Sequence, residues 1–139
     1  MKMKKTMRVL TILVVFSILL AATAFAAPAR ASAYLSAYYA TITKTSTGDL
    51  SIHFQVIAPA IMDQRGVSRI AVQRYTGSYW RTEYNFTYPE TLELQGQNVG
   101  VYSQTVLYTP QYSDASYRAV VKFYASNSSG YDTGVYTAD

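Results

Sequence analysis

The chain has no cysteine and a single histidine among its 139 residues. Without thiols it can form neither a disulfide nor a lipid anchor on cysteine, and one histidine leaves too few ligands for the usual zinc and redox sites. The alternation around His53 places that side chain in solvent, which favours a surface residue over a catalytic base. We therefore expect no cofactor and no metal.

Acidic residues are few, and none has the spacing of a known site. The aspartates in predicted turns are Asp49, Asp63, Asp114 and Asp132. None belongs to the Asp-x-Asp-x-Asp-Gly series that holds calcium, and turn formation explains them. Glu90 and Glu93 are the nearest pair for glycoside hydrolysis, but a small sandwich offers little cleft. We expect no enzymatic activity.

Positive charge is concentrated at the N-terminus. The formal net charge is +4, and the surplus basic residues are Lys2, Lys4, Lys5 and Arg8. From Ala27 onward eight basic side chains stand against eight acidic ones. The overall basicity therefore gives no support for nucleic-acid binding by counterion release.

Residues 1–26 have the pattern of a secretory signal peptide. A basic start precedes an apolar run at residues 9–22, and Ala24-Phe25-Ala26 is a small-x-small cleavage site. A second such site at residues 31–33 would move the mature N-terminus from Ala27 to Tyr34. We expect a leader helix, then a secreted domain at residues 34–139 without a membrane segment; an uncleaved anchor is the alternative. Cysteine-free exported domains are typical of Gram-positive bacteria, which favours an extracellular or cell-wall location.

Beyond residue 34, apolar residues recur at every second position, which is the period of strands. The predicted strands cover residues 34–44, 50–57, 67–75, 79–88, 99–108, 117–127 and 131–136. A short edge strand or loop is predicted at residues 89–98. Residues 58–60 are predicted to end a strand, because Pro59 lacks a ladder donor. Residues 61–66 are predicted to be a loop or one helical turn that crosses between sheets, with Ile61 and Met62 closing the core. The pattern indicates one all-β antiparallel sandwich of about seven strands.

Two strands need a choice of inward face. In residues 79–88 the alternation groups Trp80 with Tyr84 and Phe86 and predicts a buried Trp80, which leaves Arg81 and Glu83 outside. In residues 99–108 the period does not decide. Either the odd-numbered row from Val99 to Leu107 faces inward, or the row of Tyr102, Val106 and Tyr108 does.

The closing hairpin resembles the last two strands of immunoglobulin-like and fibronectin type III domains. A tyrosine after a polar corner opens an alternating run that ends in Ala, and an Asn-x-x-Gly turn follows. The matching residues are Tyr117, Ala119, Val121, Phe123, Ala125, Asn127 and Gly130. The resemblance implies an immunoglobulin-like sandwich in which the Tyr117 hydroxyl bonds to backbone at residues 110–113.

The whole chain also resembles a group of small secreted proteins of Firmicutes. The shared features are the leader, a Met-Asp-x-x-Gly-Val segment at residues 62–67, a Gly-Ser-x-Trp hairpin at residues 77–80 and the closing run. This resemblance implies export but no activity.

Tyrosine is what the chain has in excess, with fourteen residues, all after position 33. One small core cannot bury them all, and tyrosine supplies large amphipathic contact area in binding faces. In an immunoglobulin-like topology the strands at residues 67–75 and 117–125 are neighbours, so their outward rows, including Gln73, would form a basic aromatic face. The predicted binding residues are Arg69, Tyr75, Tyr79, Arg81, Arg118, Lys122 and Tyr124.

This face predicts a secreted, non-catalytic binding or adhesion module. Its partner would be an extracellular protein, a glycan or an anionic cell-wall polymer, bound by stacking and cationic contacts. The simpler alternative is a solvated sheet face on which Tyr and Arg serve strand propensity and cross-strand pairing. A further alternative is a small secreted hydrolase or enzyme inhibitor that uses the segments at residues 58–66 or 89–98.

Overall fold

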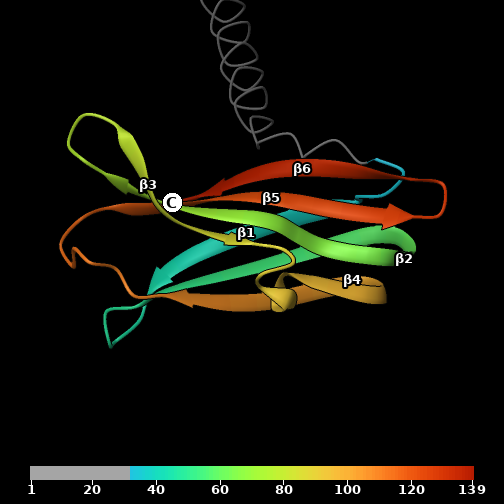
Figure 1. The fold of residues 1–139 in the computed structure, drawn as a ribbon, viewed down its shortest axis with the longest axis horizontal. Helices are drawn as coiled ribbons and strands as arrows, with labels where there is room; N and C mark the ends of the chain where they lie inside the picture. Colours follow the sequence, from blue (N-terminus) through green and yellow to red (C-terminus); the bar gives the residue numbers. More distant parts are fainter. Residues whose placement is uncertain (1–31) are drawn as a thin grey trace, which may run out of the picture.

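Residues 32–139, the part of the chain that the computed structural model describes, form six strands in one antiparallel sheet. The strands are β1 (Ala37–Lys44), β2 (Leu50–Tyr75), β3 (Trp80–Thr87), β4 (Gln95–Tyr108), β5 (Tyr117–Asn127) and β6 (Gly130–Ala138), with a 3-10 turn η1 (Leu92–Leu94) (Figure 1). The prediction of an all-β antiparallel fold is confirmed. The predicted leader helix lies outside the described residues.

β2 is the strand about which the sheet folds. Its first half pairs with β1 and β4, and its second half pairs with β3 and β5. At the bend, residues 64–66 pair with β4 on one side and with β5 on the other. Ile57 is opposite Val101 and Met62 is opposite Val99, so the four residues 58–61 of β2 stand against the single Gly100 of β4. Extra residues on one strand bend it and raise its twist. Figure 1 shows β2 running along one layer and returning along the other.

The prediction that a strand ends at residues 58–60 and that residues 61–66 form a loop or helical turn is wrong, because all of these residues belong to β2. Two predicted strands are therefore one, and the count is six rather than about seven. Pro59 stands in the extra stretch, exposed and without a ladder partner, where its missing N–H costs no sheet bond. Met62 is buried as predicted, whereas Ile61 is exposed.

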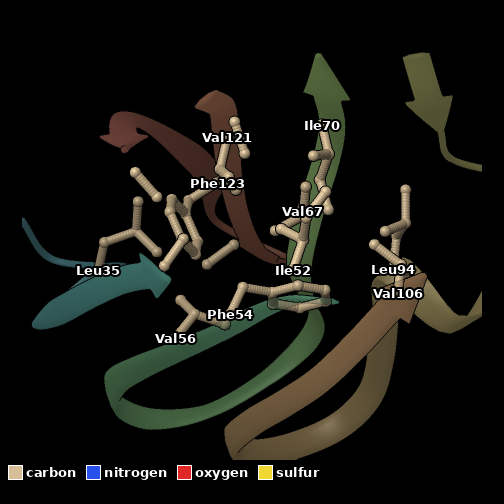
Figure 2. Close-up of a cluster of buried hydrophobic side chains, with 14 of the residues drawn as sticks. Leu35, Ile52, Phe54, Val56, Val67, Ile70, Leu94, Val106, Val121 and Phe123 are labelled. Carbon is tan, nitrogen blue, oxygen red and sulfur yellow. The ribbon is translucent and has the colours of Figure 1, made fainter. Parts of the chain in front are cut away.

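The bend produces two layers that bury their facing sides. The first layer contains β1, the first half of β2 and β4; the second contains β3, the second half of β2, β5 and β6. Figure 2 shows Ile52 and Phe54 of the first layer packed towards Ile70 and Phe123 of the second. Each such side chain stabilises the fold by roughly 1.5–3 kcal/mol when it leaves water.

The β2–β4 register decides the inward face of β4. Leu50, Ile52 and Val56 are buried, and their partners are Tyr108, Val106 and Tyr102. Directly paired residues share a face, so this row points inward. Val101, Ser103, Thr105 and Leu107 are exposed on the opposite side of β4.

Aromatic rings close the two seams between the layers. At the β1–β6 seam the rings of Tyr38 and Phe123 lie 4.8 Å apart, and a Cβ added at Gly134 would stand 2.4 Å from Cζ of Tyr38. At the β3–β4 seam Tyr84 and Tyr108 stack with centroids 5.7 Å apart. The layers thus meet through side chains where no ladder joins them.

Arg65, near the end of the β2 bend, is fully buried. Its Nη2 donates to the Ala60 carbonyl oxygen at 2.6 Å, while Nε and Nη1 have no partner among the described residues. Burial lowers the pKa of the Arg65 guanidinium, because a low-dielectric interior disfavours the charged form. Arg65 therefore contributes one hydrogen bond within the bend and leaves two buried donor nitrogens without a partner in the described residues.

Any side chain at Gly66 should destabilise the fold. Its φ is +147°, and an added Cβ would lie 2.0 Å from the Leu94 carbonyl oxygen. We expect Gly66→Ala to lower the free energy of unfolding by at least about 3 kcal/mol, measured by urea denaturation. Gly77→Ala, where φ is +96° with no atom within 4 Å, is the control and should lose about 1–2 kcal/mol. Equal losses would contradict the close packing of β2 against η1 and β4.

Arg65→Met should raise the free energy of unfolding by about 1 kcal/mol, because it keeps the volume and removes two unsatisfied buried donors. Arg65→Ala, which removes the volume as well, should lower it by about 2 kcal/mol. Thermal and urea unfolding measure both. A loss above about 1 kcal/mol in the Met variant would mean that the guanidinium makes compensating bonds.

Candidate functional site

The solvent side of the second layer carries most of the residues predicted to bind. β2 and β5 are neighbours, as predicted: Gln73 is opposite Arg118, and Arg69 is opposite Lys122. We call this side the outer face. Its side chains are Arg69, Ala71, Gln73 and Tyr75 of β2, Trp80, Thr82, Asn85 and Thr87 of β3, Arg118, Val120, Lys122 and Tyr124 of β5, and Tyr131, Thr133, Val135 and Thr137 of β6.

One end of the outer face is an ordered cluster around Trp80. The Arg118 guanidinium carbon lies 4.4 Å from the Trp80 ring centroid, and the Tyr75 ring is 5.3 Å away on the same strand pair. Nε of Arg118 donates to Oε1 of Gln73 at 2.8 Å, and Nε2 of Gln73 donates to Oγ1 of Thr82 at 3.2 Å. We call these five residues the Trp80 cluster. Stacking and the Gln73 bond fix the plane of the guanidinium.

A bulge in β3 changes which residues belong to the face. Val72 pairs with Tyr84 and Gln73 pairs with Thr82, so Glu83 is an extra residue between them. Tyr84 faces inward as predicted, but Trp80 lies on the outer face, and the prediction of a buried Trp80 is wrong. The shift reverses the alternation on either side of it.

Arg81 is displaced from the outer face by the same bulge. It is opposite Arg74, whose Nε forms an ion pair with Oε1 of Glu83 at 2.9 Å and whose guanidinium lies 4.2 Å from the Tyr112 ring centroid. Arg81 therefore shares the other side of the layer with Arg74. The prediction that Arg81 joins the basic aromatic face is wrong.

Three cations remain on the outer face, and no strand position on it holds an acid. Arg69 and Lys122 are directly opposite and exposed, and Arg74–Glu83 is the ion pair found within residues 32–139. The one carboxylate bonded to a side chain of the face is Glu90, at its edge, where Oγ1 of Thr87 donates to Oε2 at 2.6 Å and lowers the pKa of Glu90.

The remaining predicted residues lie at the two ends of the face. Tyr75 is exposed and its hydroxyl donates to the Gly77 carbonyl oxygen at 3.1 Å, while Tyr79 is exposed in the β2–β3 turn. Tyr124, at the opposite end, stacks on Tyr131 with centroids 5.8 Å apart. Trp80 and Tyr131 are the outer-face aromatics that the sequence pattern missed. The register of the β5–β6 hairpin could have indicated Tyr131, whereas no sequence signal marked the bulge beside Trp80.

The acidic residues considered for catalysis do not surround the pocket at the end of the sandwich. This pocket has a volume of about 190 Å³ and is lined by Ile42, Thr43, Lys44, Leu50, Pro110, Ser113, Ala115, Tyr117 and Asp139. Asp63, Glu90 and Glu93 are not among these residues. No three His, Asp or Glu residues in the described part of the chain group closely enough to hold a metal ion.

Tyr117 lines this pocket, but its hydroxyl is buried without a hydrogen-bond partner in residues 32–139. The predicted bond to backbone at residues 110–113 is therefore absent, and that part of the immunoglobulin-like expectation is wrong. The ring instead packs 6.4 Å from Tyr108.

His53 lies on the solvent side of the first layer, as predicted. Its Nδ1 is 3.1 Å from Oγ1 of Thr105 and its Nε2 is 3.3 Å from Oγ of Ser103. Both ring nitrogens thus contact hydroxyls of β4.

Among the described residues, no helix is long and apolar enough to cross a membrane.

Comparison of the chain with models of protein families, with curated proteins and with solved structures found no match. The resemblance to small secreted proteins of Firmicutes therefore stays a prediction. The function has to be inferred from the chemistry of the outer face.

The contact between Arg118 and Trp80 should be measurable in solution. A double-mutant cycle with Arg118→Ala and Trp80→Ala should give a coupling free energy of about 1 kcal/mol in urea unfolding. Arg118→Ala should also shift the fluorescence of Trp80, the one tryptophan of the chain, whereas Arg81→Ala should not. Zero coupling, or an equal spectral shift from both variants, would contradict the cluster.

Proposed function

We propose that the protein is a secreted, non-catalytic binding module whose outer face binds an anionic polymer at the bacterial cell surface. The observation that carries this proposal is the gathering of Arg69, Lys122 and Arg118 on one face without an acid in any of its strand positions. Because the residues after position 26 are balanced in charge, this separation of charge is local rather than a result of an excess of basic residues.

The Arg69–Lys122 pair favours a negatively charged partner. Like charges directly opposite on neighbouring strands destabilise a sheet. A phosphate or carboxylate between them would remove that repulsion, and it would gain from two cations at once. The two adjacent cations therefore attract a single anionic group without fixing its orientation.

Arg118 supplies a second and more directional site. Its Nε is bonded to Gln73 and its flat face rests on Trp80, so the two terminal amino groups remain for a ligand. An arginine held in this way loses little side-chain entropy on binding, and its fork matches the oxygens of phosphate or carboxylate. The neighbouring Tyr75 adds an exposed ring against which a sugar or another flat group can stack.

The spacing of the two sites favours a polymer over a small ion. Arg118 and Lys122 are four residues apart on β5, which corresponds to roughly 14 Å along the strand. Between them the face carries the paired side chains of Ala71 and Val120, neither of which is charged. A linear chain with repeated anionic groups can contact both sites at once, and its second contact benefits from a high effective concentration.

The same proposal includes two further points: the domain is related to immunoglobulin-like domains, and the protein is exported. The β5–β6 hairpin and the two facing layers support the relationship to immunoglobulin-like domains. The leader pattern at residues 1–26 supports export to the cell surface. An exposed cationic aromatic face suits a protein that meets anionic cell-wall polymers there.

Binding should be tested with polyphosphate, polygalacturonate and neutral dextran, using Trp80 fluorescence and calorimetry. We expect the two polyanions to bind with an affinity that falls as salt rises, because exposed charges are screened, and dextran not to bind. Lys122→Ala and Arg118→Ala should each weaken binding about tenfold.

Arg81→Ala is the matched control, since it removes one exposed positive charge from the other side of the same layer and should leave the affinity unchanged. Equal weakening by Arg81→Ala and Lys122→Ala would indicate non-specific attraction. Unchanged binding in the Arg118→Ala and Lys122→Ala variants would overturn the proposal.

A further inference from the structure

We propose that two copies of the chain pair through β4, in an antiparallel and two-fold symmetric arrangement that extends the first layer across both copies. This inference concerns the first layer only. It does not depend on the proposed function, because the outer face belongs to the second layer.

β4 is an edge strand without the features that protect edges. Within the described residues it pairs with β2 alone. Its fourteen residues, QGQNVGVYSQTVLY, include no charged residue and no proline, and Val101 and Leu107 are 51% and 62% exposed. Natural edge strands usually carry Lys, Pro or a bulge to prevent pairing with another chain.

The backbone of β4 offers its hydrogen-bonding groups to solvent. The Thr105 N–H donates to Oε1 of the adjacent Gln104 at 3.1 Å, so this N–H points away from β2. In an antiparallel strand, residues of the same parity direct N–H and C=O to the same side. The odd-numbered residues from Val101 to Leu107 therefore present a row of donors and acceptors, and the group that complements such a row is another strand.

The other edges are not equally available, which limits the assembly to two copies. β1 lies close against β6 and β5, with Tyr38 packed on Phe123 and Gly134, whereas β4 approaches β3 less closely, through the rings of Tyr84 and Tyr108. β3, the free edge of the second layer, carries Arg81 and Glu83. A single unprotected edge produces a closed dimer, whereas two would allow an open fibre.

A second copy suits this edge because the strand is self-complementary. With the two-fold axis at Ser103, the two Ser103 residues face each other and exchange both backbone bonds. Val101 then lies opposite Thr105 of the second copy, and both of these residues are exposed on the solvent side. No charged side chain on β4 is brought near its own copy, so no repulsion opposes the pairing.

The solvent side of the first layer continues smoothly across such a dimer. Its side chains are Ala37, Tyr39, Thr41 and Thr43 of β1, Ser51, His53, Gln55 and Ile57 of β2, and Val101, Ser103, Thr105 and Leu107 of β4. None of these side chains is an aspartate, glutamate, lysine or arginine. The dimer would therefore have an uncharged side in the first layers, while the cationic outer faces remain exposed.

Sedimentation equilibrium of residues 34–139 and of the full chain, from about 1 μM to about 1 mM, tests the proposal. The native chain should show a concentration-dependent dimer. Ser103→Lys, which places two ammonium groups opposite each other, should raise the dissociation constant at least about tenfold. Thr41→Lys makes a comparable change on β1, on the same side of the layer, and should leave the dissociation constant unchanged.

Mixing Ser103→Lys with Ser103→Glu supplies the sharpest test, because opposite charges would then meet at the two-fold axis. We expect each variant alone to be largely monomeric and the mixture to dimerise, with circular dichroism showing that both remain folded. A native chain that stays monomeric throughout the range, or a mixture that does not dimerise, would overturn the proposal. Unchanged polyanion binding by the Ser103→Lys monomer would keep this result separate from the proposed function.

Discussion

β2 continues without a break through its bend, and every other strand except β6 pairs directly with it. Because one strand supplies both layers, the bend decides where its second half lies, and a register shift at Ser68 then places Arg69 and every second residue up to Tyr75 on the solvent side. Gly66 permits that bend, since its backbone passes the Leu94 carbonyl more closely than any side chain allows. β5 and β3 then pair with the second half of β2, and their registers place Arg118 and Trp80 beside Gln73. The candidate site is thus a consequence of the fold at the bend.

Charge is separated in space although the residues after position 26 are neutral overall. Arg74 and Glu83 neutralise each other on one side of the second layer, and Asp49 caps a turn where Thr109 and Thr47 donate to its carboxylate and lower its pKa. The cations of the outer face have no such partners in their own strand rows. Composition alone could not reveal this separation, since it depends on which side of a strand each residue occupies.

The sequence predicted the local parts of the fold well and the site incompletely. Two-residue alternation located the hairpins, the buried rows and the β2–β5 pairing that brings Arg69 to Lys122, because one face of each strand is driven out of water. It missed the strand at residues 58–66, since Pro59 ends strands except where no ladder bond is needed. It also misplaced Trp80 and Arg81. The bulge at Glu83 arises from the register with β2, and no residue type in β3 itself indicates it.

Backbone amide shifts of the ¹⁵N-labelled protein, followed as polyphosphate is added at low salt, report directly on the proposed binding of polyanions by Arg118, Arg69 and Lys122. We expect the shift changes to be confined to the second layer, in residues 69–75, 80–82 and 118–124. Changes centred on β1 and β4, or no changes, would show that the outer face is not the binding surface.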